Sequence, residues 1–177
     1  MIKKIAPALL LISFSVASLA QDKSNNLKIN IFSPVVKTLN LQYERVLNKD
    51  QSFQFGFFYT GYSSSGTSLS GVGFTPEYRF YLSGDAAPDG VYIAPFLRYQ
   101  SFTLSDDQND KGTLSTFGGG VILGRQWVFK GRITLDLFIG PSYNSGSVSV
   151  TSGTNNFSVG SVNSFGVRGG ICFGVAF

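Results

Sequence analysis

The last fourteen residues, Ser164 to Phe177, carry an alternation that constrains the fold of the whole chain. Large apolar residues take nearly every second position from Phe165 onward, and small or charged residues take the positions between them. Successive side chains of a β-strand point to opposite faces, so the segment predicts a strand with one apolar and one small, polar face. A strand that separates lipid from a narrow lumen needs this pattern. We expect Phe173, Val175 and Phe177 to face lipid.

The N-terminus predicts export. Two lysines precede the apolar stretch Ile5 to Val16, which is too short for a membrane-spanning helix. Small residues at Ser18 and Ala20 fit a cleavage site, although an uncleaved N-terminal anchor is the alternative. We predict a cleaved signal peptide over residues 1–20 and a single outer-membrane β-barrel domain over residues 21–177.

The composition excludes several classes of protein. Charged residues make up 14% of the chain, well below the ~25% typical of soluble domains. Beyond the signal peptide no apolar run is long enough for a membrane helix. Cleavage would remove two of the fourteen basic residues and leave twelve against ten acidic ones, without any basic cluster. A nucleic-acid partner is therefore not expected.

Turn-rich breaks divide the rest of the chain into eight predicted strands. Most of them reach the ~9–11 residues that a tilted membrane strand requires. The fold prediction is all-β, an eight-stranded antiparallel up-and-down transmembrane β-barrel. The boundaries near Pro34 and in Asn144 to Asn163 stay open. The strands are Leu27 to Ser33, Lys37 to Leu47, Gln51 to Tyr62, Ser70 to Leu82, Val91 to Leu104, Leu114 to Val128, Arg132 to Tyr143 and Ser164 to Phe177.

The connections differ in length between the two ends of the predicted barrel. With both termini in the periplasm, the periplasmic connections are Asn48 to Asp50, Ser83 to Gly90 and Phe129 to Gly131. Three of the four outer connections are long and polar, as expected for outer-membrane barrels. The outer connections lie near Pro34 and at Ser63 to Leu69, Ser105 to Thr113 and Asn144 to Asn163.

The lipid face carries aromatic residues near strand ends and three prolines within strands. Amphipathic rings settle at headgroup level, which predicts an aromatic girdle. Because proline lacks a backbone donor, we expect bulges or ladder breaks at Pro76, Pro95 and Pro141. The predicted girdle consists of Tyr43, Tyr59, Tyr99, Trp127 and Tyr143.

The opposite face collects the charges. Eight strands leave a lumen only wide enough for side chains, so unpaired charges would be costly and a paired network is expected. The network would plug the lumen; the alternative is a ligand site or gated pathway in which Arg98 and Arg168 receive an anion. The predicted network is Lys28, Glu44, Glu77, Arg79, Arg98, Asp136 and Arg168, with the amides Asn30, Asn40, Gln42, Gln54, Gln100 and Gln126 on the same face.

Catalytic and metal chemistry finds little support in the residues. The chain has no histidine, which removes the usual Ser-His arrangements, so we expect neither an enzyme, a cofactor nor a metal site. The loop Ser105 to Thr113 holds Asp106, Asp107 and Asp110, but Lys111 and Gly118 occupy positions where a calcium loop needs ligands. A solvated acidic loop is the favoured interpretation.

The segment Asn144 to Asn163 is the candidate for surface interaction. Val148 and Val150 alternate with small polar residues, so the segment could extend the last two strands as a hairpin and offer an edge for β-augmentation. The alternative is a flexible polar loop without a partner.

Three stretches carry a family resemblance: Asn40 to Arg45, Gly73 to Tyr81 and Tyr92 to Phe96, together with the terminal aromatic. They resemble a family of small, functionally uncharacterised outer-membrane β-barrels of Gram-negative bacteria. In design these are similar to the OmpA transmembrane domain and OmpX. The resemblance implies insertion by the barrel-assembly machinery, with Phe177 inside the recognised C-terminal segment. It implies no activity.

These observations together favour a small barrel in the bacterial outer membrane with a structural or surface-interaction role. Its expected partners are outer-membrane lipid or lipopolysaccharide, the assembly machinery and an extracellular ligand at the outer loops. A ligand-binding or narrow transport barrel is the alternative, and a lipid-modifying enzyme ranks third. The sequence does not fix the partner, the passage of a solute or the oligomeric state.

Overall fold

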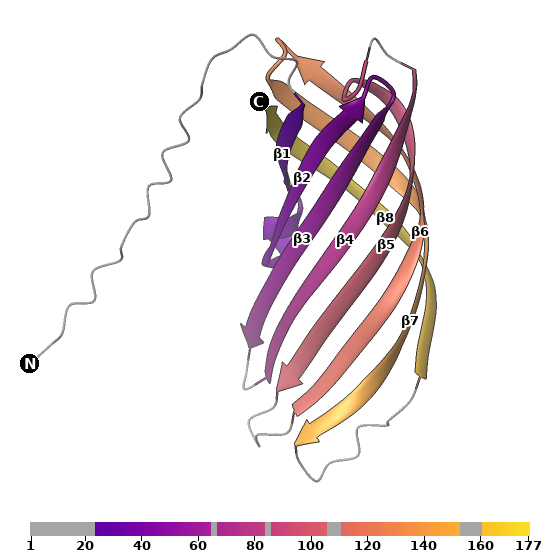
Figure 1. Cartoon of the computed structure of the whole chain (residues 1–177). Helices are drawn as coiled ribbons and strands as arrows, with labels where there is room; N and C mark the ends of the chain where they lie inside the picture. The colour runs from indigo at the N-terminus through magenta and orange to yellow at the C-terminus, as the bar shows by residue number, and fades with distance from the viewer. Residues whose placement is uncertain (1–23, 65–66, 84–85, 106–110, 153–160) are drawn as a thin grey trace, which may run out of the picture.

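A computed structural model describes residues 24–64, 67–83, 86–105, 111–152 and 161–177. The predicted signal peptide lies outside these ranges. Each of the eight predicted strands has its counterpart, and a short 3-10 helix, η1, joins the first two (Figure 1). The elements are β1 Asn25–Asn30, η1 Ser33–Val36, β2 Thr38–Asn48, β3 Gln51–Ser64, β4 Thr67–Ser83, β5 Gly90–Ser105, β6 Lys111–Phe129, β7 Ile133–Ser152 and β8 Ser161–Ala176.

The sheet is all-antiparallel and closes on itself. Each strand pairs with the next one along the chain, and β1 pairs with β8 to close the barrel. At the closure, the backbones of Asn25 and Phe177 exchange hydrogen bonds of 3.1 and 2.8 Å. We call this end of the barrel the terminal end, and the opposite end, where β3 turns into β4, the loop end (Figure 1).

The turn between β6 and β7 shows how local residues set the register at the terminal end. Lys130 and Gly131 both have positive φ values, 48° and 62°. Arg132 N donates to Phe129 O across the turn at 3.0 Å. Two consecutive residues with positive φ define the type I′ hairpin turn, whose twist matches that of the flanking strands.

The first strand is shorter than predicted. The predicted strand Leu27 to Ser33 ends in the structure at Asn30, and Ser33 begins η1. Pro34 stands in the first turn of this helix, where its fixed φ and missing N–H are tolerated. The β1–β2 hairpin therefore turns back near mid-height of the barrel, whereas β3 to β8 continue to the loop end (Figure 1).

The seventh strand is longer than predicted, and the prolines interrupt the sheet as expected. β7 continues past Tyr143 to Ser152, and β8 begins at Ser161, so the segment Asn144 to Asn163 does extend both strands. The ladder between β4 and β5 is interrupted near Pro76 and Pro95, and that between β6 and β7 near Pro141. The register is the same on both sides of each break, so these prolines remove pairs without forming bulges.

The barrel is apolar outside and polar inside. Its outer wall exposes large hydrophobic side chains, such as Phe117 at 57% and Ile139 at 63%, whereas the interior buries charged and amide side chains. A small apolar cluster around Tyr92, Phe96 and Phe138 completes the interior. No helix within the described ranges is long and apolar enough to cross a membrane.

Candidate functional site

Six of the seven predicted lumen charges form one connected network in the structure, and Arg98 remains outside it. The six come from β1, β2, β4, β7 and β8, and all point inward because they share the inward parity of their strands. The network lies mainly in the half of the lumen nearest the terminal end. Its ion pairs join Lys28, Glu44, Glu77, Arg79, Asp136 and Arg168.

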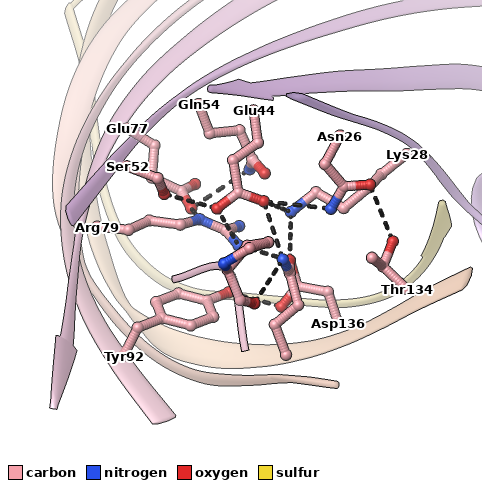
Figure 2. A network of polar contacts seen from close by, with 12 residues as sticks. Asn26, Lys28, Glu44, Ser52, Gln54, Glu77, Arg79, Tyr92, Thr134 and Asp136 are labelled. Carbon is pink, nitrogen blue, oxygen red and sulfur yellow. Dashed lines mark hydrogen bonds and ion pairs between the residues drawn. The ribbon is translucent and has the colours of Figure 1, made fainter. Parts of the chain in front are cut away.

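Lys28 ties the closing strand β1 to the rest of the barrel. Its Nζ lies 2.9 Å from Glu44 Oε2 on β2 and 3.0 Å from Asp136 Oδ2 on β7 (Figure 2). The same ammonium donates to Gln126 Oε1 on β6 at 2.7 Å. An ammonium group has three donors, so Lys28 is fully satisfied with its charged atom out of solvent.

Arg79 links the acids Glu77 and Asp136. Its Nε donates to Glu77 Oε1 at 2.7 Å, and its Nη1 lies 2.9 Å from Asp136 Oδ2. Its Nη2 has no hydrogen-bond partner within the described chain, but the guanidinium lies 4.2 Å from the centre of the Tyr92 ring. A cation over an aromatic face is attracted by its quadrupole, which compensates in part for the missing bond.

Glu77 carries the network towards the loop end. One carboxylate oxygen accepts from Arg79, and the other accepts from Arg168 Nη1 on β8 at 2.8 Å. The side chains of the network thus join β1 to β8 across the lumen, in addition to the backbone hydrogen bonds that pair these two strands in the sheet.

Gln126 joins the β4–β5 connection at the terminal end to the network. Gln126 Oε1 accepts from Lys28 and from Arg79 Nη1, and its Nε2 donates to Glu44 Oε2 at 3.0 Å. The same Nε2 donates at 2.9 Å to the carbonyl of Pro88, which lies between β4 and β5. A backbone segment at the terminal end is therefore bonded directly to the network.

Two tyrosines belong to the network although the sequence analysis did not include them. The hydroxyl of Tyr81 donates to Glu44 Oε1 at 2.7 Å, and that of Tyr92 donates to Asp136 Oδ1 at 2.8 Å. Both residues have the inward parity of β4 and β5, like Arg79 and Phe96. Strand parity alone could have found them, but only charged and amide residues were assigned to the inward face.

The network holds three bases and three acids, and their charged atoms are almost completely buried. Buried charges are tolerated when they are paired and hydrogen-bonded, as they are here. A ring of eight strands has room only for side chains inside it, and the side chains of the network are buried there. Chemically, the arrangement can fix the strand register and hold the barrel closed.

The predicted girdle and C-terminal residues lie on the outer wall. Tyr43, Tyr59, Tyr99 and Tyr143 are exposed, and Trp127 is half-buried beside Arg125, whose guanidinium lies 5.2 Å from its ring. Phe173, Val175 and Phe177 are exposed on β8 and at its end.

The described residues contain no group of three His, Cys, Asp or Glu side chains that could hold a metal ion. Asp106, Asp107 and Asp110 lie outside the described ranges, so the acidic-loop interpretation remains a prediction.

Comparison with curated proteins and with solved structures finds no significant match. A family model described as a protein of unknown function, DUF3575, matches residues 7–155. Since the match covers most of the chain, the protein belongs to this family.

Proposed function

We propose that this chain is a bacterial outer-membrane β-barrel whose lumen is plugged by its charged network and whose role is structural or surface-interacting. The network would fix the closure of the barrel, and the strand extensions at the loop end would meet partners outside the cell. No catalytic role is proposed.

The inverted polarity of the barrel is the observation that carries this proposal. Glu44, Arg79 and Asp136 are completely buried, whereas Phe117 and Ile139 lie more than half exposed on the outer wall. Water would penalise such an exposed apolar wall, since soluble monomers rarely expose large contiguous apolar patches. A bilayer favours it, because lipid meets the apolar residues and the polar residues face the lumen.

Two features of the sequence also support the proposed location in the outer membrane: the predicted signal peptide and the aromatic residue Phe177. In that setting the exposed tyrosines would lie at headgroup level next to lipid or lipopolysaccharide. The assembly machinery would recognise the segment that ends in Phe173, Val175 and Phe177. Density-gradient separation of the two membranes tests the location, and recovery with the inner membrane or the soluble fraction contradicts it.

Conductance across planar lipid bilayers tests the plug. The purified barrel should show no large single-channel conductance, because fully buried side chains fill the lumen in its terminal half. Stable openings of porin size in the wild-type protein would contradict the plug, and the transport alternative would then replace it.

The strand extensions at the loop end support the surface-interaction role. β7 runs on to Ser152 and pairs with β6 as far as Lys111, so an ordered sheet projects beyond Tyr143. The described part of β8 on the loop-end side of Cys172 pairs with β7 alone, so its other side offers an edge that can accept a strand from a partner. Deleting residues 149–158 should abolish binding to host proteins or cell surfaces while the barrel still folds, and unchanged binding would exclude this segment.

A further inference from the structure

The loop-end half of the lumen holds a positive charge without a counter-charge. Arg98 makes no ion pair with any described residue, and its buried Nε has no hydrogen-bond partner. Its guanidinium lies 5.7 Å from the Phe96 ring, and that of Arg168 lies 4.5 Å from the same ring. Arg168 pairs with Glu77, whereas Arg98 pairs with no carboxylate among the described residues, which leaves one positive charge in excess.

A small polar cavity lies at this charge. Its volume is about 50 Å³, and its lining includes Arg98, Arg168, Asn30 and Asn40. The unpartnered Nε of Arg98 is a donor, and buried donors are almost always hydrogen-bonded, so the cavity offers a site for an acceptor. Gln42 also lines the cavity, but its unpartnered Oε1 is itself an acceptor and does not contribute to binding an anion.

The barrel wall is incompletely paired beside this cavity. β8 pairs with β1 only from Cys172 to Ala176, and Ile31 N adds a last bond to Ile171 O at 3.1 Å. Towards the loop end, the described part of β8 pairs with β7 alone, because the chain turns away into η1. We call this gap between β8 and the β1–β2 hairpin the seam.

An apolar groove of about 460 Å³ opens at the corner of the seam. Phe32 from the β1–η1 turn, Ile171 from β8 and Ile139 from β7 line it. Phe138 and Gly169 border both the groove and the polar cavity. The Arg168 guanidinium lies 4.9 Å from the Phe138 ring, so the apolar and cationic sites meet at one side chain.

We propose that the seam binds an amphiphile with one carboxylate or phosphate headgroup and an alkyl chain. Arg98 and Arg168 hold the headgroup in the cavity, and the groove holds the chain along the outer wall. The anion neutralises the excess charge and accepts hydrogen bonds from the guanidinium N–H groups that have no other partner. The inference rests on the proposed membrane location, because the seam then opens sideways to lipid and the ligand need not cross the plug.

Equilibrium dialysis with radiolabelled carboxylates tests the proposal on the purified protein in a non-ionic detergent. Acetate, hexanoate and decanoate vary the chain, and decanol removes the charge. Decanoate should bind saturably at one site per chain. Each added methylene that enters the groove should strengthen binding by up to about four-fold. A series with decyl phosphate shows which headgroup is preferred.

Arg98→Gln is the informative variant and Arg45→Gln its matched control. Arg45 is an exposed arginine whose Nη1 donates to Asn25 Oδ1 at 3.3 Å at the terminal end, away from the seam. Loss of a charge-assisted hydrogen bond should weaken decanoate binding about ten-fold or more in R98Q, with R45Q unchanged. Arg98→Lys keeps the charge and should retain much of the affinity.

Four results would overturn the proposal: decanoate uptake no greater than in empty micelles, equal affinity for decanol, equal affinity for acetate, or no loss in R98Q. Only protein that keeps its folded gel mobility before heating enters the assay. A failure to bind therefore removes the ligand site and leaves the membrane-barrel proposal standing. If R98Q does not fold, the comparison of acetate, hexanoate, decanoate and decanol on the wild-type protein still tests whether the seam binds an anionic amphiphile.

Discussion

The two halves of the lumen differ in how completely their charges and strands are paired. In the terminal half, Lys28, Glu44 and Asp136 have ion-pair partners within 3.0 Å, and all eight strands close the ring. In the loop-end half, Arg98 has no ion pair within the described ranges, and the described part of β8 does not pair with β1. The same fold thus combines a closed, neutral half with an incompletely paired, positive one.

This difference indicates that the terminal half of the lumen stabilises the barrel and the loop-end half binds a ligand. A densely paired network makes its surroundings rigid, since most of its charged groups are fixed by several partners. An unpaired charge beside an unpaired strand edge leaves donors for a ligand. The comparison therefore predicts that substitutions in the terminal half mainly affect stability, and substitutions around Arg98 mainly affect binding.

The largest effect is expected for Arg79→Gln. This change removes the cation that contacts Glu77 and Asp136 at 2.7 and 2.9 Å and leaves buried carboxylates without it. Breaking a buried ion pair costs about 3–5 kcal/mol. The temperature at which the folded barrel opens in detergent, read from its gel mobility, should fall markedly, and Glu44→Gln should lower it as well. An opening temperature unchanged in both variants would refute a stabilising network.

An intermediate effect is expected for Gly140→Ala on β7. A Cβ at this position would clash with Val121 O and lie 2.6 Å from Ile122 Cα, both backbone atoms of β6. Overpacking of this kind costs about 1–3 kcal/mol. Gly166→Ala on β8 is the control, because its nearest atom is Ser142 Oγ at 3.6 Å. Equal denaturant midpoints for the two variants would contradict the tight packing of β6 on β7.

A smaller effect is expected for Tyr81→Phe. The change deletes the hydroxyl that donates to Glu44 Oε1 at 2.7 Å, and a hydrogen bond to a charged group contributes about 1.5–3 kcal/mol. Ser52 donates to the same oxygen at 2.6 Å, so we expect the lower end of this range. Tyr78→Phe is the control, since its hydroxyl bonds to Gln51 on the outer wall. Equal destabilisation by both changes would remove Tyr81 from the network.

The smallest effect on stability is expected for Arg98→Gln. Because this arginine has no carboxylate partner among the described residues, its removal leaves no acid unpaired. The opening temperature should stay the same or rise slightly. A fall as large as that of Arg79→Gln would show that Arg98 belongs to the network, and the contrast between the two halves would disappear.

Strand parity predicted most of the fold and much of the site. The alternation of large and small residues in Ser164 to Phe177 predicted β8, and the same reasoning put Lys28, Glu44 and Asp136 on the inward face. Parity gives the face of a residue but not which side chains on distant strands its own side chain reaches. Hence Arg98 was grouped with six charges that it does not pair with.

Two other features depend on interactions that the pattern does not encode. Pro34 allows either a strand edge or a helical first turn, so the early end of β1 and the seam could not be predicted. The hydrogen bond from Gln126 to the Pro88 carbonyl joins residues 38 positions apart, and no local sequence pattern predicts it.

Heat-modifiability in outer-membrane fractions tests the central claim most directly. Unboiled and boiled samples are compared on a detergent gel. The account predicts that unboiled protein migrates as a compact folded species and shifts on boiling, because a closed, membrane-embedded barrel resists detergent until it is heated. Recovery of the protein from the soluble periplasm, with the same mobility before and after boiling, would contradict it.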